Sequence, residues 1–490
     1  MTRLAAAAFG LSAILASGAS PAAAQLQGET FIHDPSTVTE SDGKYYTFGT
    51  RGGGLVSDDG WTWRSGPERP GGGVAPDVIK IGDRYYVAYA VGGGGMSGGH
   101  ASQVKIMWTL SLDPKSPRFK YHDVGVVASS DGVETADAID PAFLYVDGHL
   151  WLTYGTYFGP IRIIELDPKT GLRVAGNQPV DVAIDMEATA MMHRDGWYYL
   201  LGTHGTCCDG PNSTYHIRVG RSRSPLGPYV DHMGTPLLRG GGKLVLGARG
   251  RNIGPGHFGL IELDGGVEKF SMHYEADMDR SGRSVLGIEP LRWTDGWPVA
   301  GENIVPGTYE VASERSGYAL GLATDVVRIA FDPRRSFMAK PTDPVSPIPD
   351  QTLAQDSAGW PQGRIRVDLA DYMNRPHQLW TIAPAAGAGG YFGAPYYTIT
   401  IAGTARVLAA TGQGEVESVP AFTGATEQLW RIDQLTDGTY RIMPKSVPGG
   451  RAGLALVAIG VSTPTLAKFD PASPAGRWTF KQPQPIPGQR

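Results

Sequence analysis

A tight turn followed by an aromatic strand recurs along the first part of the chain, and this repeat constrains the fold more than any other feature. Four copies resemble one another closely, and a fifth is looser. The copies occupy residues 42–46, 83–86, 147–151, 195–199 and 264–274. Aromatic strands after tight turns indicate β-hairpins, and repeats every few tens of residues are typical of solenoids and propellers. We therefore predict a five-bladed β-propeller over residues 28–300, with a large β-sandwich as the alternative.

A different repeat marks the rest of the chain. Trp380 and Trp430 each end a Gln-x-Trp triplet, and Trp478 ends the degenerate triplet Gly-Arg-Trp. The three tryptophans stand 50 and 48 residues apart, and even spans of this kind resemble a ricin-type β-trefoil. We predict such a trefoil-like domain over residues 301–485, with the proline-rich stretch 341–349 as a long loop inside its first lobe. Helical periodicity is scarce throughout, so we expect an all-β chain.

The first residues predict export. Arg3 gives a positive start, residues 4–15 form an apolar run, and Ala22-Ala23-Ala24 fits the small-x-small cleavage pattern of a signal peptide. We expect residues 1–24 to be removed by cleavage near Ala24, which gives a secreted or periplasmic protein. The apolar run is too short to cross a bilayer, so no membrane association is expected. The 43 basic and 48 acidic residues form no basic block, which argues against nucleic acid as a partner.

Three carboxylates precede aromatic strands in similar positions. They are Asp34, Asp140 and Glu187. In a propeller the innermost strand of each blade lines the axis, so side chains far apart in sequence converge there. Glu187 stands between Met186 and Ala188, and desolvation by such neighbours raises the pKa of a carboxyl group, as a general acid requires. A surface glutamate at the start of a strand is the alternative interpretation.

Six short segments together resemble glycoside hydrolase family 43, and within it the arabinan-degrading members. The segments are His33-Asp34-Pro35-Ser36, Ala75-Pro76-Asp77-Val78, Ala138-Ile139-Asp140-Pro141, Glu187-Ala188, Asn212-Ser213-Thr214-Tyr215 with Val219-Gly220-Arg221-Ser222, and Gly254-Pro255-Gly256-His257. The resemblance implies that Asp34 is the general base, that Glu187 is the general acid, and that Asp140 tunes and orients the acid. It also implies inversion at the anomeric carbon, for which the acid and the base stand about 6.5–9.5 Å apart.

The same resemblance suggests the surroundings of the reaction. By it, His257 helps to hold a metal ion, often calcium, through water at the propeller axis; a polar surface histidine is the alternative. His33 belongs to a matching segment, and Trp108, Tyr157 and Phe158 are candidates for stacking on sugar rings, although blade packing explains aromatic residues equally well. Cys207 and Cys208 would lie beside the substrate, either as a disulfide or as two thiols.

The function that follows is an exported inverting hydrolase of α-1,5-linked L-arabinan or arabino-oligosaccharides. Its partner would be plant cell-wall arabinan, and we expect a monomer. An α-L-arabinofuranosidase or β-xylosidase is the first alternative, and a non-catalytic carbohydrate-binding protein is the second. The trefoil favours fold without lectin function, because Leu320, Leu408 and Leu454 are not followed by the acid that sugar-binding lobes of this type use.

Overall fold

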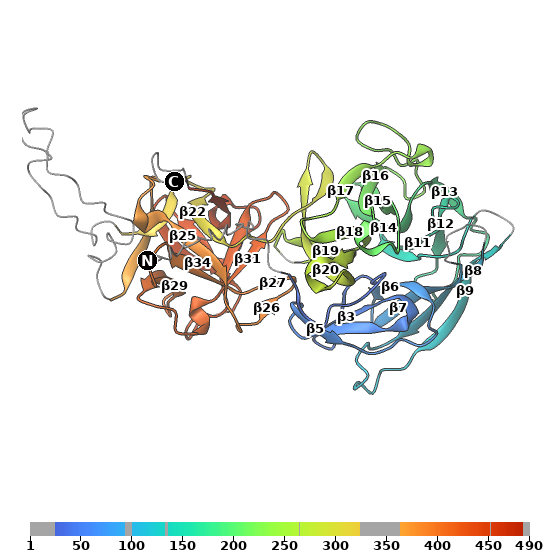
Figure 1. The fold of residues 1–490 in the computed structure, drawn as a ribbon, viewed down its shortest axis with the longest axis horizontal. Coiled ribbons are helices and arrows are strands. Elements are labelled where there is room, and N and C mark those ends of the chain that lie inside the picture. The colour runs from blue at the N-terminus through green and yellow to red at the C-terminus, as the bar shows by residue number, and fades with distance from the viewer. Residues whose placement is uncertain are drawn as a thin grey trace, which may run out of the picture.

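The computed structural model describes residues 25–483 apart from 94–99, 133–135, 264, 324–362 and 451. Its two β-rich halves lie side by side, with the first repeat on the right of Figure 1 and the second on the left. The predicted signal peptide and the proline-rich loop fall outside the described residues. Within them, the helices are short 3-10 turns, and none has the length and apolar character to cross a membrane. The turns are η1 (Thr50–Gly52), η2 (Gly210–Asn212), η3 (Leu237–Arg239), η4 (Met278–Arg280), η7 (Pro376–Gln378), η8 (Thr426–Gln428) and η9 (Pro474–Gly476).

Five sheets, each built from strands that follow one another in the chain, form the first half. The first sheet has the order β1 (Gln27–Gly28), β5 (Thr62–Ser65), β4 (Gly54–Ser57), β3 (Lys44–Phe48) and β2 (Thr39–Ser41). The second consists of β6 (Val74–Ile81), β7 (Arg84–Gly92), β8 (Ala101–Thr109) and β9 (His122–Asp131). The third consists of β10 (Ala142–Val146), β11 (His149–Tyr154), β12 (Ile161–Leu166) and β13 (Val180–Ala183). The fourth consists of β14 (Glu187–Arg194), β15 (Trp197–His204), β16 (His216–Ser222) and β17 (Lys243–Leu246), and the fifth of β18 (Asn252–Glu262), β19 (Glu268–Asp277), β20 (Arg283–Thr294) and β21 (Trp297–Ala300).

The prediction of a five-bladed propeller is confirmed, and the repeat that led to it marks the second strand of each blade: β3, β7, β11, β15 and β19. The Asp-Gly turns before three of these strands have positive φ at both central residues, as in Asp42-Gly43 with 50° and 74°. Such turns match the twist of a hairpin, which explains the Asp-Gly pairs. The first strands of successive blades contact one another from β2 through β18, so they form the inner wall.

One backbone feature recurs at the inner strand of every blade. A non-glycine residue with φ between 47° and 63° stands there, which is uncommon for residues with a Cβ. These residues are Asp34, Ala75, Asp140, Ala188 and His257. In β6, β14 and β18 the residue lies in a β-bulge, a device that re-aims side chains beside active sites. Three of the predicted site residues, Asp34, Asp140 and His257, therefore share this backbone conformation, and His257 also lies in a bulge.

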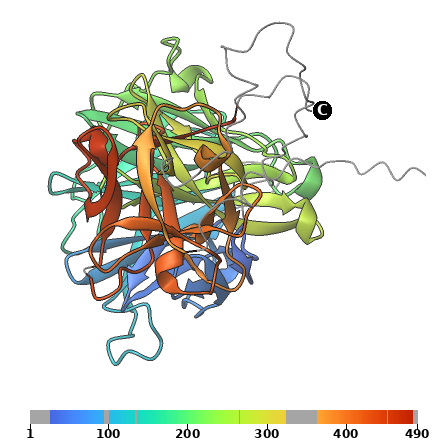
Figure 2. The ribbon, with the colours of Figure 1, turned by 90° about the vertical axis from the view of Figure 1, so that its left-hand side faces the viewer.

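The second half is built on a ten-stranded sheet and two hairpins. The sheet contains β22 (Gly307–Ser313), β23 (Ala319–Leu322), β24 (Ile365–Ala370), β25 (Trp380–Pro384), β28 (Tyr397–Ile401), β29 (Val407–Ala410), β30 (Val416–Val419), β31 (Trp430–Gln434), β32 (Tyr440–Pro444) and β35 (Trp478–Lys481). The hairpins are β26 (Gly390–Tyr391) with β27 (Ala394–Pro395), and β33 (Leu454–Ile459) with β34 (Thr463–Lys468). In Figure 2 this half faces the viewer.

The three tryptophans of the second repeat play the same part in the three lobes. Each is fully buried, and its indole N–H donates to the carbonyl of a leucine in its own lobe. The pairs are Trp380 with Leu320 at 2.7 Å, Trp430 with Leu408 at 3.0 Å, and Trp478 with Leu456 at 2.9 Å. This threefold core accounts for the spacing of the tryptophans and agrees with the predicted trefoil.

Candidate active site

Asp34 lies in a cage of hydrogen-bond donors at the inner wall. Its Oδ1 is 3.3 Å from His257 Nδ1, its Oδ2 is 3.0 Å from His33 Nδ1, and the Thr50 hydroxyl donates to Oδ2 at 2.5 Å. Its backbone N–H donates to His273 Nδ1 at 2.9 Å. Burial alone would raise the pKa of Asp34, but the hydrogen bond from His257 and the charge of His33 hold it well below its usual value. Asp34 is therefore ionised at neutral pH, as a general base must be.

Glu187 has the opposite protonation state. Burial raises its pKa, and the negative charges of Asp140, Asp34 and Glu275 raise it further. The Tyr215 hydroxyl donates a hydrogen bond to its Oε1. A carboxyl group kept protonated near neutral pH can act as a general acid, so the pair meets the electrostatic demands of acid–base catalysis.

Asp140 connects the acid to the third blade. Its Oδ2 accepts a hydrogen bond from the backbone N–H of Ala188 at 3.1 Å, directly after Glu187. Burial raises the pKa of Asp140, and the nearby His257 opposes that rise. The structure thus brings together the three predicted carboxylates, with Asp140 both orienting the segment that carries the acid and raising the acid's pKa.

Glu275 forms hydrogen bonds with two of the histidines that surround Asp34. Its Oε1 accepts from His33 Nε2 at 3.1 Å and from His273 Nε2 at 3.2 Å, and its Oε2 accepts from the backbone N–H of Cys208 at 3.2 Å. Burial opposes ionisation, but the hydrogen bonds from His273 and His33 lower the pKa of Glu275 to about 2. Burial lowers the pKa of His33. The hydrogen bonds to Asp34 and Glu275 and the negative charges of both outweigh this effect and raise the pKa of His33 to about 10. His33 is therefore a cation held between two carboxylates.

The predicted substrate contacts have different outcomes. Cys207 and Cys208 form a disulfide. The backbone N–H of Cys208 donates a hydrogen bond to Glu275, so the pair lies at the site. Phe158 is 39% exposed and lies in the loop after β11, which is fixed next to Asp140 by the hydrogen bond from the Gly155 N–H to the Ile139 carbonyl at 2.8 Å. Its contact with the substrate stays a prediction.

The prediction for Trp108 is corrected by the structure. Trp108 pairs with Tyr86, which pairs with Ile79, so it lies towards the far end of the second blade from the bulge at Ala75. There its ring stacks on His122 at 4.2 Å between ring centroids, and the Arg84 guanidinium covers it at 4.4 Å. Trp108 packs the blade and is not part of the site.

Comparison with known proteins decides the family. A family model described as glycosyl hydrolases family 43 matches residues 28–298. The chain belongs to glycosyl hydrolase family 43. A second model, described as ricin-type beta-trefoil lectin domain-like, matches residues 376–449. The family 43 match covers the propeller that holds the acids, and the second match falls within the trefoil half.

Individual relatives of this family 43 chain carry related names. The extracellular endo-alpha-(1->5)-L-arabinanase 1 of Bacillus subtilis (strain 168) is 29% identical over 324 residues, which cover 59% of this chain and 95% of the relative. The extracellular exo-alpha-(1->5)-L-arabinofuranosidase ArbA of Cellvibrio japonicus (strain Ueda107) is 28% identical over 306 residues, which cover 55% and 86%. A crystal structure of an exo-1,5-alpha-L-arabinanase from a bovine ruminal metagenomic library is 31% identical with a TM-score of 0.51, and the match covers 56% of this chain and 97% of that chain.

Several residues of the family 43 site were not predicted. Tyr215 belonged to a matching segment but had no role assigned, and Thr50 stands in an ordinary turn. His273 and Glu275 stand two residues apart on the fifth aromatic strand, so their side chains lie on the same face, and both are buried. In the sequence, the available signal was two polar residues at this spacing in an aromatic strand. Tyr157, by contrast, was predicted together with Phe158 as a candidate for stacking on sugar rings, and burial and the charge of Glu187 raise the pKa of its hydroxyl.

Replacing Asp140 by asparagine tests its electrostatic role. The amide oxygen of the new side chain can still accept the hydrogen bond from Ala188, but the side chain carries no charge. Since ionised Asp140 raises the pKa of Glu187, its removal lowers that pKa. We expect the alkaline limb of the kcat/KM profile of Asp140→Asn to move to lower pH, because Glu187 loses its proton earlier. Asp113→Asn, which breaks a pair with Lys44 elsewhere in the propeller, is the control. An alkaline limb that does not move would contradict this role.

Proposed function

We propose that this chain is an exported, inverting glycoside hydrolase that cleaves α-1,5-linked L-arabinan or arabino-oligosaccharides. The observation that carries the proposal is the opposite shift of two carboxyl pKa values at one site, down for Asp34 and up for Glu187. Family membership and the arabinan-directed names of the relatives support the substrate. The names of relatives as extracellular enzymes, and the signal-peptide pattern of residues 1–24, support export.

In the proposed reaction, water attacks the anomeric carbon and the glycosidic bond breaks. Asp34 takes a proton from the attacking water as the new carbon–oxygen bond forms. Glu187 gives its proton to the leaving glycosidic oxygen, which departs with the bonding electron pair. Attack opposite to the leaving group inverts the anomeric centre. Asp140 keeps Glu187 protonated and oriented, and the His33 cation keeps Asp34 ionised.

The deciding experiment uses linear α-1,5-arabinan and follows the first-formed anomer by NMR. The proposal expects hydrolysis with inversion, and the product profile separates endo action, which gives a ladder of oligomers, from exo action, which gives one short product. Hydrolysis of aryl β-xylosides but not of arabinan would favour the β-xylosidase alternative. Binding of arabinan without hydrolysis would favour the carbohydrate-binding alternative.

We further propose that His257 helps to hold a calcium ion through water. Asp34, His257 and His273 offer donor atoms within 4.8 Å of one another, but they supply two imidazoles and one carboxylate. Calcium takes about 6–8 oxygen ligands, so these residues fit an ion that keeps its own water shell and do not fit direct coordination. The ion would add positive charge near Asp34.

Metal removal tests this assignment. We expect calcium in elemental analysis of the purified protein, loss of activity after treatment with a chelator, and recovery when calcium is added back. His257→Ala is expected to lose the metal. Protein that contains no metal and is indifferent to the chelator would contradict the proposal.

A further inference from the structure

The ring of blades closes between the first and the fifth blade, and we call this junction the seam. Among the described strands, none pairs with both of these sheets. The N-terminal segment 25–34 bridges them instead. The Leu286 N–H donates to the Thr30 carbonyl at 2.8 Å, and the Ser284 hydroxyl donates to the Ile32 carbonyl at 2.7 Å. Closure of the ring therefore depends on contacts between this segment and the fifth blade, among them these two to β20 and those of Arg280 in η4 to Thr30 and Leu26.

The seam passes through the active site. Asp34 belongs to the first blade. Its carboxylate contacts His257 and its backbone N–H donates to His273, and both histidines belong to the fifth blade. The pair between His33 and Glu275 also crosses the seam, at 3.1 Å. The relative position of two blades thus sets the surroundings of the proposed base.

A hairpin of the trefoil half enters the seam. We call residues 389–396, which contain β26 and β27, the docking hairpin; Figure 1 shows both strands at the boundary between the halves. Phe392 at its tip is 4% exposed and shares one hydrophobic core with Trp61 of the first blade and Ile288 of the fifth. Its ring centroid lies 4.8 Å from that of Tyr45. One side chain of the trefoil therefore packs against both blades that the ring must join.

Glycines permit this close approach from both sides. The Gly393 N–H donates to the Gly60 carbonyl at 3.0 Å. A Cβ at Gly60 would meet the Phe392 ring at 2.5 Å, and a Cβ at Gly393 would meet Ile288 at 2.7 Å. The backbones of the hairpin and of the propeller thus pack so closely that a side chain at either glycine would clash.

Strand β19 links the docking hairpin to the active site. Its alternate residues present one buried polar face. At one end of that face, the Lys269 ammonium group donates to the Phe392 carbonyl. Farther along it, His273 accepts from the Asp34 N–H, and Glu275 bonds to the neighbouring His33. A displacement of β19 at the hairpin would therefore be transmitted to the base.

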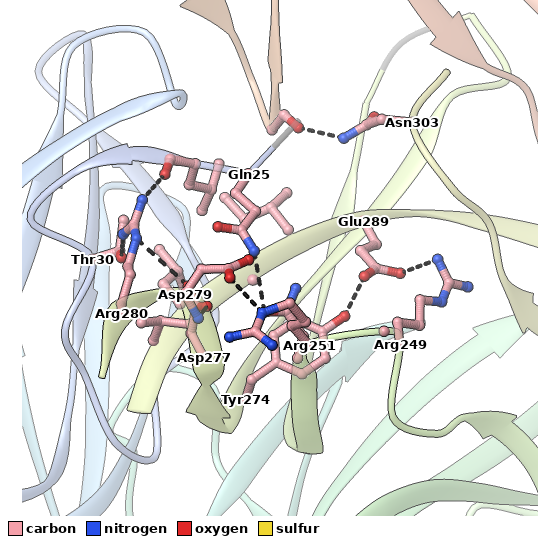
Figure 3. Close-up of a pocket in the computed structure, with 18 of the residues that line it drawn as sticks. Gln25, Thr30, Arg249, Arg251, Tyr274, Asp277, Asp279, Arg280, Glu289 and Asn303 are labelled. Atoms are coloured by element: carbon pink, nitrogen blue, oxygen red, sulfur yellow. Dashed lines mark hydrogen bonds and ion pairs between the residues drawn. The ribbon is translucent and has the colours of Figure 1, made fainter. Parts of the chain in front are cut away.

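A cavity of about 720 Å³ lies beside the seam, and Figure 3 shows its side chains. Its lining includes Leu26, Thr30, Leu286, Asn303 and Gly393. Charged side chains in the cavity form ion pairs with one another, such as Arg249 with Glu289 at 2.8 Å. We therefore assign no ligand to this cavity. The Asn303 side chain donates to the Gly393 carbonyl at 2.7 Å, which ties the hairpin to the linker between the halves. The hairpin, the linker and the N-terminal segment meet here.

We propose that the docking hairpin holds the seam closed, and that Phe392 is a positioning residue for Asp34. The trefoil half then serves the reaction by fixing the first blade against the fifth, without touching the substrate. The kinetic part of this inference rests on the proposed hydrolase function. The structural part, closure of the seam, does not.

The test compares Phe392→Ala with the unchanged full-length chain. Amide hydrogen exchange, read by mass spectrometry in peptides that contain Ile32 and Leu286, reports opening of the seam. We expect faster exchange in both peptides and a fall in kcat on arabinan of about 10- to 100-fold, as small displacements of catalytic groups produce. KM is expected to change less than kcat, because the substrate contacts remain.

Phe422→Ala, which removes an exposed phenylalanine of the trefoil half, is the matched control and should change neither reading. Phe392→Leu should restore part of both, and if Phe392→Ala does not fold, Phe392→Leu carries the test with smaller changes in the same direction. Unchanged exchange at the seam would overturn the proposal, and so would faster exchange with unchanged kcat. If the unchanged chain does not hydrolyse arabinan, the proposed function fails while the exchange comparison still decides closure of the seam.

Discussion

Glu187→Gln is expected to lower kcat on arabinan by about 10²–10⁴-fold while the fold and KM stay close to those of the unchanged chain. Glutamine cannot give a proton to the leaving oxygen. It is neutral, like the protonated Glu187 that burial and the neighbouring acids favour, and it can still accept the hydrogen bond from Tyr215. The substitution therefore removes the proton with little other change.

Two further readings distinguish the loss of an acid from general damage. An aryl arabinofuranoside with a good leaving group needs little protonation, so Glu187→Gln should hydrolyse it far better than it hydrolyses arabinan. The alkaline limb of the pH profile should disappear, because the group that titrates there is gone. Glu165→Gln on β12, where the carboxylate pairs with His149, is the control. Near-normal turnover of arabinan by Glu187→Gln would refute the assignment.

The propeller could be predicted because its signal is local. An Asp-Gly turn with two positive φ values and the aromatic strand that follows it are encoded within a few residues, and the repeat counts the blades. The trefoil is similar, since each buried tryptophan bonds to a leucine of its own lobe. The three carboxylates could be found because each precedes such a strand.

The remainder of the site depends on contacts between distant parts of the chain. His273 meets Asp34 across 239 residues, and Glu275 meets His33 across 242. No local pattern encodes such pairs. Phe392 is likewise one of several aromatic residues between Tyr391 and Tyr397, and only the folded structure shows that it packs into the propeller.

Trp108 shows the limit of composition as a guide. Aromatic residues occur on the second strand of every blade and on several other strands, and alternation indicates which face of a strand a residue occupies. It does not indicate which end of the blade is the mouth. That information comes from the bulges with positive φ, which mark the inner strands at the site.

Asp34→Asn is expected to reduce kcat by about 10²–10⁴-fold, and this loss should differ in kind from that of Glu187→Gln. Asparagine cannot take a proton from water, so attack on the anomeric carbon becomes slow whatever the leaving group is. An aryl arabinofuranoside should therefore not restore the activity of Asp34→Asn, although it restores much of that of Glu187→Gln. The contrast between the two substrates assigns the two roles separately.

The surroundings of Asp34 give this prediction a second reading. The Asp34→Asn substitution keeps the size of the side chain and the backbone N–H bond to His273, but it removes the charge that helps to keep His33 protonated. The pKa of His33 should fall from about 10, and NMR titration of its ring can measure the change. Asp113→Asn should leave that titration unchanged. If Asp34→Asn instead recovers activity with the better leaving group, then Asp34 is not the group that activates water. The base would then have to be another carboxylate of the site.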